Sequence, residues 1–334
     1  MSVFEEIKTS LHDAINIEFF NRFLIKPFFV MMVGLPGSGK STVAKRISNV
    51  TGAKIFSSDS YREKLLGNEN DQSNNQLVFD TLYNDMCHYL SNGESVIFDA
   101  TNISLKSRHK ALDRLPRYLL YQKVAYVVNT SYDLCVINDK ERDRSVGEDV
   151  IKKFLHQYQC PQHFEGFDEV ILHSQYWNRY NEYFEPDAIY LSSEMDKFDQ
   201  HNPHHIHSVG KHCDLLAEQC DDYIMKAAAY YHDLGKIYTQ HFDENGVAHY
   251  YNHDNVGAYL LTCTPHVFST LIEWDEVLEA IFFVNYHMRA HRDFTGAKAE
   301  RKYRGLFGSK RFDKLMQFAE YDRIASGTYE KEKN

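Results

Sequence analysis

The segment GLPGSGKS at residues 34–41 directly follows the apolar run FFVMMV at 28–33. Between a strand and a helix, the backbone N–H groups of such a turn bind polyphosphate. The lysine contacts the terminal phosphates and the serine hydroxyl can ligate Mg²⁺. The segment predicts a P-loop pocket for ATP or GTP with Mg²⁺; a glycine-rich turn that binds no nucleotide is the alternative. The predicted nucleotide-binding residues are Gly34, Pro36, Gly37, Ser38, Gly39, Lys40, Ser41 and Thr42, with Ser41 also a Mg²⁺ ligand.

Three charged residues after predicted strands have types that suit phosphoryl transfer. Asp59 and Arg62 lie three positions apart, on neighbouring faces of a first helical turn. There a carboxylate can take a proton from an acceptor hydroxyl while a guanidinium orients a phosphate. Asp99 follows a further strand, where it can order Mg²⁺ or its water. The alternatives are an N-capping Asp59 with a surface Arg62, and a turn-forming Asp99.

Arg142 and Arg144 lie in the charged segment DKERDR at 139–144. A basic segment after a strand can close over a transferring phosphate as a lid. A salt-bridged helix surface is an equally good interpretation of the same residues.

A cluster of metal-ligand types lies in the C-terminal part of the chain. His232 and Asp233 are adjacent at the end of an apolar helical segment, and His212 lies upstream of them. Imidazole and carboxylate together suit a first-row transition metal. A single buried histidine is more often a hydrogen-bonded core residue, but the cluster His-Asp-x-Gly-Lys with a second histidine predicts a metal site.

Apolar runs that alternate with helical patterns predict an α/β domain with a parallel sheet and helices on both faces. The predicted strands are 28–33, 54–56, 95–98, 124–128 and 169–172. From about residue 200 the pattern changes to helices, which predicts a second, all-α domain. The predicted divisions are a lead-in helix at 1–27, a first domain at 28–190 and a second at 200–330.

Composition indicates a protein of two domains that does not cross a membrane. The chain has 334 residues, 43% of them hydrophobic, and no apolar run reaches the roughly 18 residues that a membrane span needs. The N-terminus has no basic segment ahead of an apolar stretch, and the six cysteines show no paired spacing. We therefore expect a cytoplasmic protein with reduced thiols.

The net charge of −10 argues against strong, sequence-blind duplex binding. Basic residues nevertheless gather with aromatic ones between 298 and 314. A solvated helix–loop face is the favoured interpretation, and a groove for single-stranded nucleic acid is the alternative. The cluster comprises Lys298, Arg301, Lys302, Arg304, Lys310, Arg311 and Lys314 with Tyr303, Phe307 and Phe312.

The motifs of the first domain resemble those of the polynucleotide 5′-kinase branch of P-loop phosphotransferases, over about 28–175. The matching segments are GLPGSGKS, Ser58-Asp59-x-x-Arg62, Asp99-Ala100-Thr101-Asn102, Arg142-x-Arg144-x-Val146, and the stretch 160–169. The resemblance implies that Asp59 is the general base on a 5′-hydroxyl and that Arg62 contacts phosphate. It also implies that the lid arginines Arg142 and Arg144 stabilise the transition state. Two positions depart from the pattern: Gly147 replaces a usual proline and Asp139 a usual asparagine.

The C-terminal cluster resembles the HD phosphohydrolase superfamily over about 204–326. The matching ligands are His212, His232, Asp233 and the distal Asp322; His253 and His287 fall where binuclear members have further ligands. The resemblance implies that Asp233 bridges two divalent ions such as Mn²⁺, Ni²⁺, Co²⁺ or Zn²⁺, and that Lys236 holds substrate phosphate. We expect supporting or structural roles for His204, His205, His207 and His291.

Together the two modules resemble HD-type polynucleotide kinase-phosphatases, although these usually carry the HD part first. This resemblance implies an ATP-dependent 5′-hydroxyl kinase and a metal-dependent 3′-phosphatase acting on single-stranded or nicked RNA or DNA ends. Because no nucleotidyl-transferring lysine motif occurs, sealing would need a separate ligase. A nucleoside or nucleotide kinase fused to a nucleotidase is the main alternative, and the acidic charge favours it slightly. A nucleotide sensor with a structural metal is the third.

Overall fold

The computed structural model describes residues 24–142, 144–173, 188–202, 206–271, 273–294 and 296–327. The chain divides into two compact units, one formed by Met1–Val128 with Gly166–His173 and the other by Asn129–Glu165 with Ser174–Asn334. The predicted lead-in helix lies almost entirely outside the described residues. Residues 129–165 cluster with the second unit, and the functional boundary near 190–200 stays a prediction.

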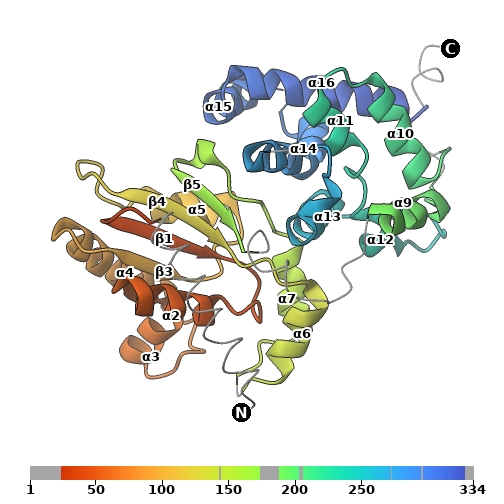
Figure 1. The fold of residues 1–334 in the computed structure, drawn as a ribbon. Coiled ribbons are helices and arrows are strands. Elements are labelled where there is room, and N and C mark those ends of the chain that lie inside the picture. The colour runs from red at the N-terminus through yellow and green to blue at the C-terminus, as the bar shows by residue number, and fades with distance from the viewer. Residues whose placement is uncertain are drawn as a thin grey trace, which may run out of the picture. The chain divides into compact units, whose positions relative to one another are not determined.

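The first unit contains a five-stranded parallel sheet with the order β2-β3-β1-β4-β5 (Figure 1). Its central strands are continuous apolar runs because helices cover both faces of such a sheet, and every residue of β1 is buried. The strands are β1 (Phe28–Val33), β2 (Lys54–Ser57), β3 (Val96–Asp99), β4 (Gln122–Val127) and β5 (Glu169–Leu172). The predicted α/β class is confirmed.

The carboxyl ends of three strands meet at one edge of this sheet. β1 pairs with β3 on one side and with β4 on the other, so the strand order reverses at β1. Ser57 pairs with Asp99 and Met31 with Phe98, so β1, β2 and β3 end at the same level. Ligands of open parallel sheets bind at such a reversal, beyond the carboxyl ends of the strands.

Helices with well-formed ends connect these strands. The side chain of Asn74 caps α4 by accepting a hydrogen bond from Leu77 N, and Ser104 and Ser107 form a capping box at α5. Because caps of this kind satisfy backbone groups that lack partners at a helix end, they fix where α4 and α5 begin. The helices are α2 (Lys40–Thr51), α3 (Ser58–Leu66), α4 (Asn75–Ser91) and α5 (Leu105–Leu112).

The second unit is built of helices around α14, which contacts α11, α13 and α16 (Figure 1). Phe282, Phe283 and Tyr286 of α14 are fully buried, and burying one such ring stabilises the fold by about 1.5–3 kcal/mol. The helices are α6 (Tyr132–Lys140), α7 (Glu148–Leu155), α9 (Ala188–Lys197), α10 (Val209–Gln219), α11 (Tyr223–Ala229), α12 (Lys236–Thr239), α13 (His253–Cys263), α14 (Trp274–Arg292), α15 (Ala297–Phe307) and α16 (Ser309–Ala325), with the 3₁₀ turns His163–Glu165 and Pro265–Val267.

A small antiparallel ladder, β6 (His241–Phe242) with β7 (Ala248–His249), interrupts the helices that the sequence predicts in this region. The carboxylate of Asp243 accepts hydrogen bonds from the backbone N–H groups of Asn245 and Val247, and Gly246 supplies a φ of 77°. This turn chemistry closes the ladder.

Gly235 lies where two backbones approach closely. A Cβ placed on Gly235 would lie 2.0 Å from the carbonyl oxygen of His253 and 2.7 Å from the nitrogen of Gly257. The turn after α11 therefore packs directly against the start of α13. A side chain at this position would have to push the two segments apart.

We predict that Gly235→Ala destabilises the second unit by about 1–3 kcal/mol, the usual result of forcing atoms into a packed contact. The matched control is Gly305→Ala, because an added Cβ on Gly305 in α15 meets nothing within 4 Å. That change should be neutral or stabilise by up to about 1 kcal/mol, since alanine favours helix over glycine. Urea denaturation measures both. Equal effects of the two substitutions would contradict the packing argument.

Candidate active sites: a phosphate-binding loop and a histidine–aspartate centre

The P-loop segment forms a turn between β1 and α2 whose backbone strongly favours glycine at three positions. Gly34 has a φ of 156°, and an added Cβ would lie 2.6 Å from Val128 O; Gly37 and Gly39 have φ values of 79° and 87°. The Nζ atom of Lys40 is buried and donates to Leu35 O at 2.7 Å. The first turn of α2 contains no acidic residue, so its positive end is available for an anion.

The loop after β3 is fastened to the base of the P-loop. Gly34 N donates to Thr101 O at 3.2 Å, and Asn102 Nδ2 donates to Met32 O at 2.9 Å. The fully buried guanidinium of Arg108 donates to Asn102 O at 3.1 Å. These bonds hold Asp99, the buried last residue of β3, at the edge that carries the phosphate loop.

Asp59 and Arg62 form an ion pair in the first turns of α3, with Arg62 Nη1 2.8 Å from Asp59 Oδ1. Arg62 is 8% exposed and also donates through Nε and Nη2 to Asn75 Oδ1 on α4. Ser57 occupies the N-cap position, so Asp59 does not cap this helix. Because Arg62 is buried, it is not a surface residue. The pair is fixed in place, with the carboxylate 43% exposed.

The segment with Arg142 and Arg144 folds around the buried carboxylate of Asp139 at the end of α6. Asp139 accepts from the Ser145 hydroxyl at 2.7 Å and from the backbone N–H groups of Val146 and Gly147 at 3.0 Å. Arg142 Nη1 lies 3.9 Å from the same carboxyl group. Burial alone would raise the pKa of Asp139, but these donors lower it below its ordinary value. The segment belongs to the second unit, and its role as a lid stays a prediction.

We predict a pH-dependent effect of Asp139→Asn, which keeps an acceptor for the backbone N–H groups but removes the charge. The lowered pKa means that the carboxylate stabilises the fold above its unfolded pKa, about 3.9, and loses this contribution as pH falls through the folded pKa. At neutral pH the variant should be less stable by about 1–3 kcal/mol. Urea unfolding from pH 7 to pH 3 should show this difference shrinking. A difference that stays constant with pH would contradict the assignment.

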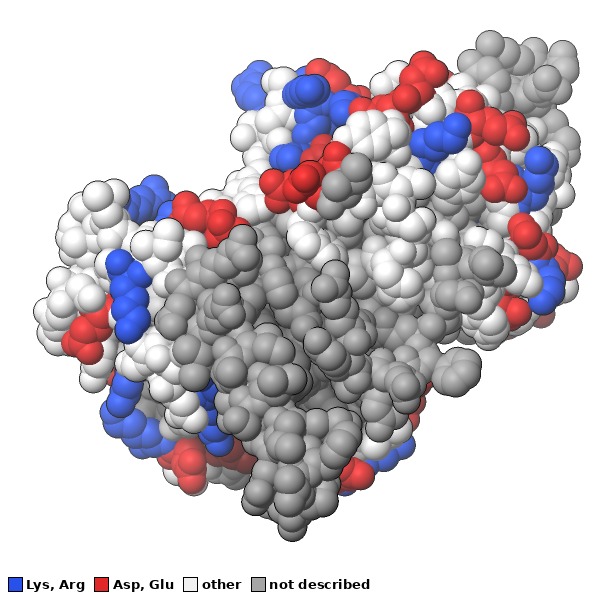
Figure 2. All heavy atoms as spheres, viewed as in Figure 1, with Lys and Arg blue, Asp and Glu red and all other residues white. Residues whose placement is uncertain are grey.

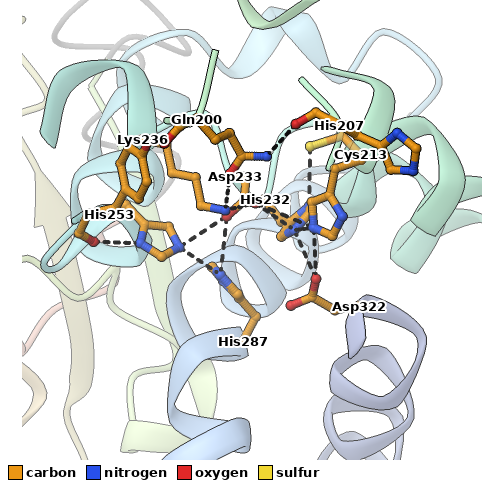
Figure 3. Close-up of polar contacts among 12 residues, drawn as sticks. Gln200, His207, Cys213, His232, Asp233, Lys236, His253, His287 and Asp322 are labelled. Atoms are coloured by element: carbon orange, nitrogen blue, oxygen red, sulfur yellow. Dashed lines mark hydrogen bonds and ion pairs between the residues drawn. The ribbon is translucent and has the colours of Figure 1, made fainter. Parts of the chain in front are cut away.

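The second site brings together ligand-type side chains from separate elements (Figure 3). His212 lies on α10 and Asp322 on α16; His232 and Asp233 lie in the turn after α11. His253 begins α13 and His287 lies near the end of α14. The four histidines and Asp233 are at most 4% exposed, and Asp322 is 9% exposed.

One half of the site consists of His212, His232, Asp322 and one oxygen of Asp233. His212 Nε2 lies 2.9 Å from Asp322 Oδ1 and 3.2 Å from His232 Nε2. Asp233 Oδ2 lies 3.5 Å and 3.4 Å from the Nε2 atoms of His212 and His232. Two imidazoles and two carboxylates therefore converge on one point.

The other half consists of His253, His287 and the second oxygen of Asp233. Asp233 Oδ1 lies 3.0 Å from His253 Nε2 and 3.8 Å from His287 Nε2, and the two Nε2 atoms are 3.1 Å apart. Asp233 thus offers a different oxygen to each half (Figure 3). A carboxylate placed in this way can offer one oxygen to each of two cations.

The hydrogen bonds of the rings show that the converging nitrogens suit a metal. The Nδ1 atoms of His232, His253 and His287 donate to the backbone carbonyls of Ala229, Tyr250 and Val284 at 2.9, 2.7 and 2.7 Å. A carbonyl can only accept, so each neutral ring presents its Nε2 lone pair to the site. When both rings are neutral, the Nε2 lone pairs of His253 and His287, 3.1 Å apart, repel each other unless a cation lies between them. The donor set therefore fits divalent transition metals.

Supporting contacts fix both carboxylates. Lys236 Nζ lies 2.6 Å from Asp233 Oδ2 and donates to Gln200 Oε1 at 2.9 Å, while His291 Nε2 lies 2.8 Å from Asp322 Oδ2. Burial alone would raise the pKa of Asp233, but the Lys236 ammonium and the imidazoles hold it well below its ordinary value. Burial alone would also raise the pKa of Asp322, but its hydrogen bonds with histidines hold it well below its ordinary value.

Several residues of these sites carry no signal in the sequence. Gln200 and Arg108 have neither a motif nor a periodic position, and Asn75 acts only through its contact with Arg62. His291 contacts Asp322, and its supporting role in the site stays a prediction. His207 accepts from Gln200 Nε2 through its carbonyl, whereas His204 and His205 lie outside the described residues.

The basic–aromatic cluster at 298–314 is partly neutralised by ion pairs. Arg304 pairs with Glu300 and Asp313, Arg311 with Glu279 and Lys314 with Asp222. Figure 2 shows basic and acidic side chains interspersed over the unit that holds these helices. These pairs favour a solvated helix face over a groove for nucleic acid.

Two family matches cover most of the two predicted domains. The family described as an AAA domain matches residues 29–161, and the HD domain matches residues 204–320. The chain joins a P-loop kinase-like domain to a helical HD domain. No curated protein matches the chain. Among the described residues, no helix is long and apolar enough to cross a membrane.

Solved structures resemble parts of the chain at low identity. A kinase from Chloroflexus aurantiacus is 17% identical, with 35% of this chain and 66% of that chain covered and a TM-score of 0.32. A chain of a Pnkp1/Rnl/Hen1 complex is 24% identical, with 34% and 38% covered and a TM-score of 0.31. A gluconokinase from Sinorhizobium meliloti is 16% identical, with 43% and 81% covered and a TM-score of 0.31. The present chain thus spans less than two thirds of the length of the first two of these solved structures.

We predict that metal stabilises the chelator-treated protein. Mn²⁺ at about 100 times its dissociation constant should add about 2.7 kcal/mol per occupied site, because a ligand that binds only the folded state stabilises it. Asp233→Ala should abolish this response, while Asp214→Ala, at an exposed position on α10, should leave it intact. Thermal denaturation with and without Mn²⁺ measures the effect. An unchanged melting temperature of the wild-type protein would refute a metal centre here.

Proposed function

We propose that the protein heals nucleic-acid ends: it phosphorylates 5′-hydroxyl ends with ATP or GTP and removes phosphate from 3′ ends carrying a 3′-phosphate or a 2′,3′-cyclic phosphate. The products, 5′-phosphate and 3′-hydroxyl, are those that a ligase requires. Sealing would be the task of a separate ligase.

The kinase reaction would use the residues at the carboxyl edge of the sheet. The P-loop amides and Lys40 would bind the nucleotide phosphates, while Ser41 and Asp99 would hold Mg²⁺ or its water. Asp59 would take the proton of the acceptor hydroxyl, and its partial exposure leaves it accessible to a polymeric substrate. Arg62, held by Asn75, would orient a phosphate. Arg142 and Arg144 are the proposed lid residues.

The phosphatase reaction would use the histidine–aspartate centre. His212, His232, Asp233 and Asp322 would hold one divalent cation, and Asp233, His253 and His287 the other. When bound, such ions supply Lewis-acid stabilisation of phosphoryl oxygens and lower the pKa of water. Lys236 would orient Asp233 and, as a buried ammonium beside the centre, attract the substrate phosphate.

The observation that carries the proposal is that one chain joins a P-loop kinase-like domain to an HD domain with a cluster of metal-ligand side chains. A centre of the first type would add phosphate, and one of the second type would remove it. Acting on the same hydroxyl of a small molecule, the two reactions would cancel and consume nucleotide. On a broken strand they act on different groups, the 5′-hydroxyl and the 3′-phosphate. Nucleic-acid ends therefore give both activities a common purpose.

A small-molecule function is the second candidate, in which a nucleoside or nucleotide kinase is joined to a nucleotidase. The net charge of −10 and the ion pairs that neutralise the basic cluster favour it. Phosphate transfer from γ-labelled ATP to a 5′-hydroxyl oligonucleotide, compared with transfer to free nucleosides, distinguishes the two. Preference for nucleosides would contradict end healing.

We predict that the two activities can be removed separately. Lys40→Ala or Asp59→Ala should lower kinase activity at least about 100-fold, because each removes charge stabilisation or proton transfer, and should spare the phosphatase. Asp233→Ala should abolish hydrolysis of 3′-phosphate and 2′,3′-cyclic ends and spare the kinase. Circular dichroism controls for folding. Loss of both activities in a folded variant would contradict two independent centres.

A further inference from the structure

Two buried asparagines form a hydrogen-bonded pair between the two helices that carry the second half of the metal centre. Asn255 lies two residues after His253 on α13, and Asn285 lies two residues before His287 on α14. Asn285 Nδ2 donates to Asn255 Oδ1 at 3.0 Å. Asn285 is fully buried and Asn255 is 6% exposed. The pair therefore links the two helices that carry His253 and His287.

Both side-chain amides also form hydrogen bonds with the backbone of residues 156–160. Asn285 Oδ1 accepts from Cys160 N at 2.8 Å, and Asn285 Nδ2 also donates to Tyr158 O at 3.1 Å. Asn255 Nδ2 donates to His156 O at 2.8 Å. Because backbone N–H groups only donate and carbonyls only accept, these partners fix which way both amides point.

The second half of the metal centre places two imidazole nitrogens close together, so the helices that carry them must be held at a fixed separation. The Nε2 atoms of His253 and His287 face each other at 3.1 Å, and the bonds of their Nδ1 atoms orient each ring only relative to nearby backbone of its own segment. Nothing in those ring bonds holds α13 and α14 together. The Asn255–Asn285 bond does so two residues from each histidine along its helix, before any ion binds.

We propose that Asn255 and Asn285 are positioning residues for the second cation of the HD centre. The backbone at 156–160 takes part by hydrogen-bonding to both amides. This inference rests on the proposed two-ion centre. The pair sets the separation of His253 and His287, and the backbone bonds keep both amides from rotating. Binding of the second ion then requires little rearrangement, which is how outer contacts raise metal affinity.

Other side chains cannot replace this pair. Aspartate at 285 would keep an acceptor for Cys160 N but would lose both donors and bring a buried charge next to Tyr158 O. Leucine would leave the backbone groups of residues 158 and 160 without their present partners. The chemistry at 285 thus requires one acceptor and two donors in a planar group, which is an amide.

The test is Mn²⁺ binding to the chelator-treated full-length protein, measured by isothermal titration calorimetry and by electron paramagnetic resonance of free Mn²⁺. Asn285→Ala should weaken the second ion about 10–100-fold and leave the first within about twofold, since loss of outer contacts has effects of this size. Asn255→Ala should act in the same direction. It serves as the test variant if Asn285→Ala does not fold.

The matched control is Gln162→Ala, because Gln162 Nε2 donates to Leu278 O in a buried bond between the same part of the chain and the N-terminal half of α14. This variant should lose stability but bind both ions normally. Wild-type affinity for both ions in the asparagine variants would overturn the inference, as would equal weakening in the control. A wild-type protein that binds only one ion would instead refute the two-ion centre on which it rests.

Discussion

The second unit depends on one buried carboxylate, that of Asp233, which offers its two oxygens to two separate pairs of imidazoles. A charge that is 2% exposed is unfavourable unless it is paired, and the ammonium of Lys236 at 2.6 Å supplies one partner. The Nε2 atoms of the four imidazoles converge on the same oxygens, a donor set that suits divalent cations. Because the ligand-type side chains come from separate helices, α10, α13, α14 and α16 all meet the turn after α11. The backbone of α13 approaches this turn so closely that Gly235 can carry no side chain.

The first unit meets a different physical requirement, because its ligand is an anion and its donors are backbone amides. The strand order fixes the phosphate loop beside β3, and the bonds of Thr101 and Asn102 fasten the two loops together. Asp59 and Arg62 are fixed by a neighbouring helix through Asn75. Preorganised donors of this kind suit phosphoryl transfer, where positioning and charge neutralisation supply most of the catalysis.

The sequence predicts those parts of the sites whose residues are neighbours in the chain. The P-loop, the five strands and the pair His232–Asp233 have local signals: apolar runs, glycine spacing and adjacent ligand types. The bonds of Asn285 to residues 125 and 127 positions away have no such signal. The burial of Arg108 is also invisible, because spacing alone predicts a charged residue to be exposed. Nor does the sequence indicate that residues 129–165 cluster with the helical unit, since the alternation of strands and helices continues through them.

Anomalous diffraction from crystals soaked in Mn²⁺ tests the central claim most directly, because it locates ions without relying on activity. Two peaks should appear, one on each side of the Asp233 carboxylate and about 3.5–4 Å apart, as in other two-metal sites. One peak would lie beside His212 and the other beside His253. Side chains in their present positions with no peak at either place would contradict the account.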